Sequence, residues 1–216
     1  MSETSTLVTA AHFEYIAART TGEDDFLRDL KREALAAGLP AIWIAPEQAA
    51  FLQILLRAAN ARALVEIGTL AGYSAIALAR ALPPDGRLHT IEINPAHADF
   101  AERWFARSNV ADRITLHRGA AANVLPTFAA QSADAVFIDA DKPNYKLYLR
   151  ECTRIVRPGG LILIDNALAH GKLFDAETTD ASVLAIRDFN EHLAATIGLQ
   201  SVIVPLGDGL WVCVRL

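Results

Sequence analysis

Two long apolar runs of this 216-residue chain end in side chains that could bind a cation. The run 136–138 ends at Asp139, and the run 161–164 ends at Asp165 and Asn166. Uninterrupted apolar runs indicate strands buried on both faces, and open α/β sheets bind ligands beyond the carboxyl ends of such strands. The three side chains offer only hard oxygen atoms, which suit Mg²⁺, Mn²⁺ or Ca²⁺ rather than Zn²⁺.

Each of these acids, taken alone, could be a helix N-cap or a solvated strand end. Two features favour a functional site over that interpretation. The second acid is followed by an amide, and Lys142 lies close to the first acid in the sequence. The pattern therefore predicts a polar site at the ends of two neighbouring strands.

A second group of candidate residues surrounds another predicted strand end. Gly68 and Gly72 follow Glu66, and glycines let the backbone turn tightly and approach a ligand at a helix N-terminus. The segment lacks the third glycine of the dinucleotide fingerprint, and Glu66 would repel a pyrophosphate, so a dehydrogenase is disfavoured. Glu92 ends the next apolar run, where an acid can accept hydrogen bonds from ribose hydroxyls. The alternatives are a solvated strand end for Glu92 and a simple helix-start glycine for Gly72.

The elements that must position these residues alternate between strand and helix. Strands are predicted over 63–68, 87–93, 113–119, 134–140, 160–166, 201–206 and 210–216. Helices are predicted over 23–37, 46–59, 72–82, 95–108, 121–130, 144–156 and 181–198. This order predicts a doubly wound α/β fold with a mainly parallel sheet, and the short turn 207–209 predicts a final antiparallel hairpin.

Composition and charge narrow the class of protein. A chain of this length with 52% hydrophobic residues can form one well-packed α/β domain. The formal net charge of −5 and the lack of a basic cluster disfavour a nucleic-acid partner. No apolar stretch is long enough for a membrane span, and residues 1–20 do not resemble a secretory signal. Cys152 and Cys213 are predicted to be reduced and packed, as in a cytoplasmic protein.

At this point a family resemblance can be stated. The motifs EIGTLAGYS, IEINP, FIDADKPNY, RPGGLILIDN and GDGL occur in this order. With them the chain resembles the cation-dependent class I S-adenosylmethionine (SAM) O-methyltransferases of the caffeoyl-CoA O-methyltransferase family and its bacterial members, and more distantly catechol O-methyltransferase. The resemblance covers residues 24–216.

The resemblance implies a Rossmann-like methyltransferase fold, with helices on both faces of a seven-stranded, mostly parallel sheet that ends in an antiparallel hairpin. It implies a single domain over 1–216. The N-terminal helices within 1–60 would contribute to the substrate site and to a dimer, and 61–216 would form the core.

The resemblance also implies a role for each matching residue. Lys142 would be the catalytic base, and the metal ligands described above would hold Mg²⁺, or alternatively Mn²⁺ or Ca²⁺. Glu92 would bind the ribose of SAM, Ala121 would lie against the adenine, and Asp141 would lie near the amino-acid end. The metal ligands would be Asp139, Asp165 and Asn166, and the cofactor-binding residues would be Glu66, Gly68, Thr69, Ser74, Glu92, Ala121, Asp139 and Asp141.

The implied activity is methylation of one hydroxyl of a vicinal aromatic diol, such as a catechol, caffeoyl or flavonoid-like group, by a cytoplasmic homodimer. Contact with a divalent cation would favour the phenolate, and the neutral amine of Lys142 would accept the proton. Two alternatives stay open: a tRNA wobble-nucleoside O-methyltransferase on the same scaffold, and a SAM-binding protein without catalysis. The retained base and metal ligands argue against the second alternative.

Some positions depart from the family pattern or have simpler interpretations. Where the family usually has Gly-Asp-Ala, residues 119–121 are Gly-Ala-Ala, so an acidic contact with adenine is lost. His170 stands where plant enzymes have a substrate-contacting Asn, and substrate preference is therefore not carried over. Tyr145 and Tyr148 are predicted to pack rather than to catalyse, and His97 is predicted to be a surface residue.

The substrate surface is expected where the family motifs are weakest. The segments concerned are residues 1–45 and the loop 167–180, together with Asp208. Trp43 could line this surface as well.

Overall fold

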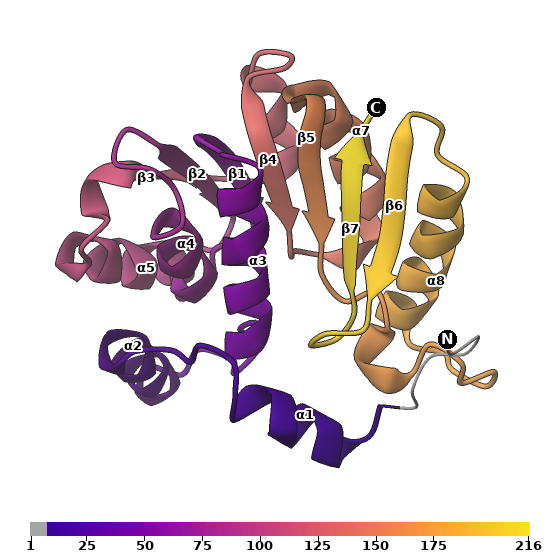
Figure 1. Ribbon diagram of the computed structural model, residues 1–216, viewed down its shortest axis with the longest axis horizontal. Coiled ribbons are helices and arrows are strands. Elements are labelled where there is room, and N and C mark those ends of the chain that lie inside the picture. The colour runs from indigo at the N-terminus through magenta and orange to yellow at the C-terminus, as the bar shows by residue number, and fades with distance from the viewer. Residues whose placement is uncertain (1–7) are drawn as a thin grey trace.

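The computed structural model describes residues 8–216 and contains one seven-stranded sheet. The part of the predicted N-terminal region before residue 8 lies outside the described residues. The strands are β1 (Ala63–Ile67), β2 (Arg87–Glu92), β3 (Ile114–Arg118), β4 (Ala133–Ile138), β5 (Val156–Ile164), β6 (Leu199–Val204) and β7 (Leu210–Arg215). Their order in the sheet is β3-β2-β1-β4-β5-β7-β6 (Figure 1).

The strand directions confirm the predicted fold class. The strands from β3 to β5 pair in parallel with their neighbours. The last strand, β7, pairs antiparallel with both β5 and β6, as expected for a C-terminal hairpin. A mostly parallel sheet leaves its carboxyl ends along one edge, and this edge is where ligands bind in open α/β folds.

Helices cover both faces of the sheet. The α-helices are α1 (Ala10–Ala17), α2 (Asp25–Ala36), α3 (Pro46–Ala58), α4 (Tyr73–Ala79), α5 (Pro95–Arg107), α6 (Ala121–Val124), α7 (Tyr145–Ile155) and α8 (Ala181–Ala194). Short 3₁₀ helices are η1 (Ala111–Arg113), η2 (Leu125–Thr127), η3 (Lys142–Asn144) and η4 (Ala169–Gly171). Residues of α2 to α5 form one core with the sheet, and residues of α6 to α8 form another on the opposite face. Figure 1 shows α1 and α2 below the edge at which β4 and β5 end.

The two central strands show why the polar residues gather at this edge. Phe137 and Leu163 pack in the core with α2 to α5, whereas Ile138 and Ile164 pack in the core with α6 to α8. All four side chains are fully buried. Because both faces are covered, the C-terminal halves of these strands are apolar, and the next polar residues come where the strands leave the sheet.

Backbone pairing then places the strand ends side by side. The amide of Asp139 donates to the carbonyl of Ile67, and the amide of Asp165 donates to the carbonyl of Ile138, both at 3.0 Å. Gly68 has φ +97°, and a Cβ there would overlap the carbonyl oxygen of Asp139. This glycine is therefore needed for the close approach of β1 and β4, besides any contact with a ligand.

Several predicted elements were wrong in their extent; the helix predicted over 181–198, for example, ends at Ala194. The helix predicted over 121–130 is only a single turn, α6, followed by η2, because Pro126 has no backbone N–H to continue the helical bonds. The strand β5 begins at Val156 rather than at 160, since the Pro-Gly-Gly segment between the predicted helix and the predicted strand forms an irregularity within the β4–β5 pairing.

Other sequence-based expectations stand as follows. Among the described residues, no helix is long and apolar enough to cross a membrane. Cys152 and Cys213 are buried free thiols, and burial raises the pKa of both. The cytoplasmic location and the homodimer remain predictions.

Candidate active site

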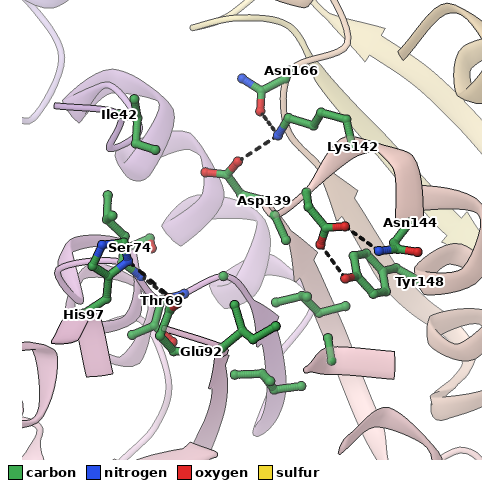
Figure 2. A pocket seen from close by; sticks show the side chains of 18 of the residues that line it. Ile42, Thr69, Ser74, Glu92, His97, Asp139, Lys142, Asn144, Tyr148 and Asn166 are labelled. Atoms are coloured by element: carbon green, nitrogen blue, oxygen red, sulfur yellow. Dashed lines mark hydrogen bonds and ion pairs between the residues drawn. The ribbon is translucent and has the colours of Figure 1, made fainter. Parts of the chain in front are cut away.

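A cavity of about 500 Å³ opens at the carboxyl ends of β1, β2 and β4. Among its lining residues are most of the site residues predicted from the sequence. They are Gly68, Thr69, Ser74, Glu92, Ala121, Asp139, Asp141, Lys142 and Asn166. Figure 2 shows Thr69, Ser74 and Glu92 on one side of the opening and Lys142 and Asn166 on the other. Glu66 and Asp165 do not line the cavity and lie behind its wall.

Glu92 organises the loop between β1 and α4. Its Oε2 accepts hydrogen bonds from the backbone amides of Thr69 (3.2 Å) and Leu70 (2.8 Å), and its Oε1 accepts one from Asn94 (2.8 Å). A carboxylate has about four lone-pair sites, so ribose hydroxyls could still donate to it. Glu92 is 7% exposed and lines the cavity, which places it for that role.

Glu66 lies deeper, in a chain of hydroxyl groups. The Thr90 hydroxyl donates to Glu66 Oε2 at 2.6 Å, and the hydroxyls of Thr69 and Thr90 lie 2.5 Å apart. Burial raises the pKa of Glu66 to about 7, although the nearby hydroxyls of Ser74 and Thr90 oppose this shift. Within residues 8–216, Glu66 Oε1 has no hydrogen-bond partner. A buried carboxylate oxygen without a donor could accept a hydrogen bond from a cationic or hydroxyl-bearing ligand.

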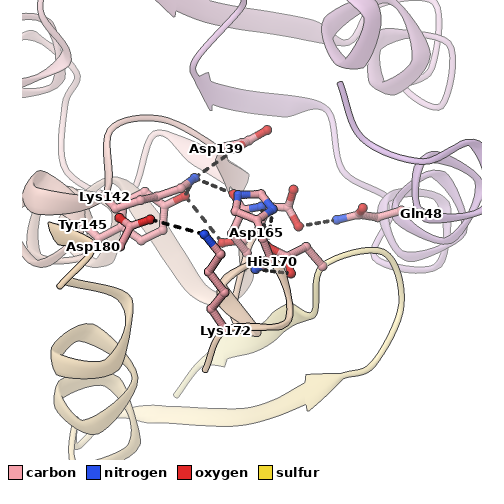
Figure 3. Close-up of polar contacts among 10 residues, drawn as sticks. Gln48, Asp139, Lys142, Tyr145, Asp165, His170, Lys172 and Asp180 are labelled. Atoms are coloured by element: carbon pink, nitrogen blue, oxygen red, sulfur yellow. Dashed lines mark hydrogen bonds and ion pairs between the residues drawn. The ribbon is translucent and has the colours of Figure 1, made fainter. Parts of the chain in front are cut away.

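Lys142 gathers the residues at the ends of β4 and β5 (Figure 3). Its Nζ donates to Asp139 Oδ1 at 3.2 Å and to Asn166 Oδ1, so the two acceptor oxygens face one point. It also donates to the phenolic oxygen of Tyr145 at 2.6 Å. The ring of Tyr145 packs edge-on against Phe189, as predicted, but the hydroxyl adds a contact with Lys142 that the packing interpretation missed.

Asp165 is the most enclosed of the three predicted metal ligands, at 5% exposed. Burial and then the nearby negative charge of Asp139 raise the pKa of Asp165. Such repulsion is expected where two carboxylates share one site, and the nearby Lys142 opposes it only in part. Within the described part of the chain, no group of three His, Cys, Asp or Glu residues converges on a cation, and this cluster contains two carboxylates and an amide instead.

The turn after β5 has an unusual backbone that Asp208 holds in place. Asn166, Ala169 and His170 all have positive φ, at 68°, 52° and 53°. Asp208 Oδ1 accepts from the His170 amide at 2.7 Å, and its Oδ2 accepts from the Asn166 side chain at 2.9 Å. Non-glycine residues in this region cost energy and persist only where the surroundings impose them. Asp208, expected only as part of the substrate surface, is thus a support for Asn166.

Asp141 lies on a different part of the wall. It accepts hydrogen bonds from the Tyr148 hydroxyl at 2.5 Å and from the Asn144 side chain. Figure 2 shows Asn144 and Tyr148 on the opposite side of the cavity from Ser74 and Thr69. The predicted role of Asp141 near the amino-acid end of SAM stays a prediction, but its side chain is already held by two neighbours.

Sequence reasoning missed some residues of this site. Gln48, from α3, donates to Asp165 Oδ1 at 2.6 Å, and nothing in the local sequence marks it. His97 was predicted at the surface but lines the cavity, where its Nδ1 lies 3.7 Å from Glu92 Oε1. His97 follows Glu92 closely in the sequence, and this proximity was the one available signal. Trp43 also lines the cavity, where it could form part of a substrate surface.

Known proteins resemble this chain over nearly its whole length. A family model described as O-methyltransferase matches residues 17–216. A protein named catechol O-methyltransferase from Niastella koreensis is 39% identical over 195 residues, which cover 89% of this chain and 88% of that protein. Another of that name, from Mycobacterium tuberculosis, is 37% identical over 190 residues, with 88% and 86% covered.

The solved structures agree. An O-methyltransferase from Bacillus cereus, determined in complex with SAH, superposes with a TM-score of 0.86 at 34% identity and covers 95% of this chain and 97% of that one. The seven-stranded sheet with its antiparallel C-terminal strands is thus the Rossmann-like fold of these enzymes. The chain belongs to the O-methyltransferase family.

Proposed function

We propose that the protein is a SAM-dependent, divalent-cation-dependent O-methyltransferase that methylates one hydroxyl of a vicinal aromatic diol. The observation that carries the proposal is the convergence of Asp139, Asn166 and Lys142 at the rim of the cavity, with Asp165 directly behind them. A methyltransferase that needed only to bind SAM would not require this group of two acids, an amide and a lysine.

The donor set fits a hard divalent cation. Asp139, Asp165 and Asn166 offer two carboxylates and an amide oxygen, the ligand types that Mg²⁺ prefers. Two of these oxygens already contact a single atom, the Nζ of Lys142, so a small cation could be reached by both. A cation held by these three side chains would have coordination positions left for the two oxygens of a diol.

The other half of the cavity fits SAM. Glu92 supports the proposed ribose contact, and the buried Oε1 of Glu66 lacks a donor within residues 8–216. The backbone at Gly119 has φ +139°, which brings the chain into the N-terminus of α6 beside Ala121. With an alanine at position 120, no acid at that position can bind the adenine amine, and the adenine would depend on backbone and apolar contacts.

The residues of this chain can be given definite tasks in the reaction. SAM supplies an electrophilic methyl group, and a divalent cation, when bound, favours the ionised form of a phenolic hydroxyl. In its neutral form, which the repulsion of a bound divalent cation would favour, the amine of Lys142 would receive the hydroxyl proton at Nζ as a general base. Tyr145 keeps that amine at the rim through its phenolic oxygen. Trp43 and Ile44 close the cavity beside the loop 68–74 and limit the access of water.

The choice of acceptor follows from the relatives named catechol O-methyltransferase. The deciding experiment is a methylation assay with catechol, SAM and Mg²⁺, repeated after treatment with EDTA and again after Mg²⁺ is restored. We expect methylated catechol only in the presence of the cation. Full activity after chelation would contradict the cation dependence, whereas cation-dependent activity toward other diols alone would contradict only the acceptor.

A further inference from the structure

Gln48 reaches the proposed cation site from a remote part of the chain. It lies in the first turn of α3 and is 1% exposed. Its Nε2 donates to Asp165 Oδ1 at 2.6 Å, across 117 positions of sequence (Figure 3). An ionised carboxylate can only accept hydrogen bonds, so the amide must present its N–H group to Asp165.

The amide of Gln48 packs closely against the turn between β6 and β7. Gly207 has φ +59°, and a Cβ at this position would overlap Gln48 Oε1. The next residue, Asp208, supports Asn166 through the 2.9 Å hydrogen bond to its side chain. Both neighbouring ligands, Asp165 and Asn166, are therefore held by side chains that other segments contribute.

The type of donor matters for what Asp165 can do. A lysine or arginine in this position would neutralise the carboxylate and compete with a cation for it. A neutral amide fixes the orientation of the carboxylate and leaves its charge in place. The contact engages Oδ1 and does not use Oδ2. In metal sites, such outer hydrogen bonds set the orientation of the ligands and affect metal affinity.

We infer that Gln48 is a positioning residue for the cation site, which orients the Asp165 carboxylate through its side-chain amide. This inference rests on the proposed function, since it assigns a task to Gln48 only if Asp165 holds a cation. The inference gives α3, a helix that carries none of the strand-end motifs, a part in the proposed cation site.

The chain offers a matched control on the same helix. Gln53 also donates through Nε2 at 2.6 Å, but its acceptor is the backbone carbonyl of Ala77 in α4. A Gln→Met change at either position keeps a side chain of similar length and removes the donor. Both changes should lower stability, whereas only the change at 48 should alter the orientation of Asp165.

The test measures Mn²⁺ binding by the electron paramagnetic resonance signal of free Mn²⁺, with no SAM or acceptor present. Gln48→Met should raise the dissociation constant about tenfold, the lower end of typical effects of outer-shell partners. Gln53→Met should leave it unchanged. If Gln48→Met does not fold, as judged by circular dichroism, Gln48→Asn removes the reach of the amide and should weaken Mn²⁺ binding in the same direction.

The outcomes distinguish a failure of the role of Gln48 from a failure of the proposed cation site. Unchanged Mn²⁺ affinity in a folded Gln48 variant, with binding by the wild type, would overturn the role of Gln48 alone. An equal loss in the Gln53 variant would also overturn it, because the effect would then reflect general destabilisation. A wild-type protein that binds no Mn²⁺ would overturn the cation site and the role of Gln48 together.

Discussion

The carboxyl edge of the sheet carries two pairs of acids that are held in different ways. On the cofactor side, Glu66 and Glu92 are bound by hydroxyls and backbone amides of neighbouring strands and loops. On the proposed cation side, Asp139 contacts a lysine, and Asp165 contacts an amide from a distant helix. The first pair is held by neutral donors from β2 and from the loops that follow β1 and β2. In the second pair, Asp139 contacts a lysine three residues away, whereas Asp165 depends on the packing of the remote helix α3.

This difference indicates which substitutions should affect the cofactor side and which should affect the proposed cation side. The loop that wraps Glu92 forms wherever β1 and β2 pair, because its donors are main-chain groups. The proposed cation half exists only when α3 and the β6–β7 turn are both packed against the end of β5. Substitutions that leave SAM binding intact should therefore be able to abolish cation binding, and the predictions below test that separation.

The largest effect is expected from Lys142→Met, which removes the proposed base from the cation half. Loss of a general base typically lowers the rate by about 10²- to 10⁴-fold, and we expect a fall of this size in kcat with catechol at neutral pH. SAM affinity, measured by calorimetry, should change little because the contacts of Glu92 remain.

Lys146→Met is the matched control for this variant. Lys146 lies on α7, close to Lys142 in sequence, but its amine pairs with Asp188 on the exposed surface. This variant should retain the kcat of the wild type. A near-normal kcat in Lys142→Met would show that Lys142 is not the base and that it only supports Asp139 and Asn166.

The same contrast explains how much the sequence could predict. The strand ends at Asp139 and Asp165 were predictable because a fully buried strand must be apolar until it leaves the sheet. Glu92 was predictable because it ends the strand after the glycine-bearing loop. Gln48 was not, since its partner is 117 positions away and a glutamine near a helix start has no distinctive local pattern.

Errors in the predicted elements also had local physical causes. The helix over 121–130 was too long because its apolar pattern outweighed the effect of Pro126. The start of β5 was too late because Pro158 and Gly159 normally indicate a turn, yet here they form an irregularity that stays within the sheet. Neither error moved a predicted site residue, because the carboxyl ends of the strands were correct.

The next largest expected effect is on the free energy of unfolding. It tests the burial of Glu66 on the cofactor side. The pKa of Glu66 is raised from 4.5 to about 7 in the folded protein. The folded state therefore holds a proton that the unfolded state releases, and stability falls as pH rises through this window. Glu66→Gln removes that penalty, so its unfolding free energy relative to wild type should rise by about 3 kcal/mol between acidic and mildly alkaline pH.

Urea unfolding at about pH 5 and about pH 8 measures this difference. Glu33→Gln, on the exposed side of α2, is the control and should differ from wild type by the same amount at both values. A Glu66→Gln variant whose advantage does not grow with pH would show that the Glu66 carboxylate is ionised in the folded protein at neutral pH.

The smallest effect, and the sharpest test of the comparison, is expected from Glu92→Gln. The substituted side chain turns an N–H₂ group toward backbone amides that now donate to a carboxylate, which should cost about 1–3 kcal/mol of stability. SAM affinity should fall about tenfold with the lost ribose contact, since about 1.4 kcal/mol corresponds to that factor. Mn²⁺ affinity should be unchanged, the reverse of the pattern expected for Gln48→Met. If Glu92→Gln weakened Mn²⁺ binding as much as SAM binding, the two halves would be a single coupled unit, and the separation drawn from their hydrogen bonds would be wrong.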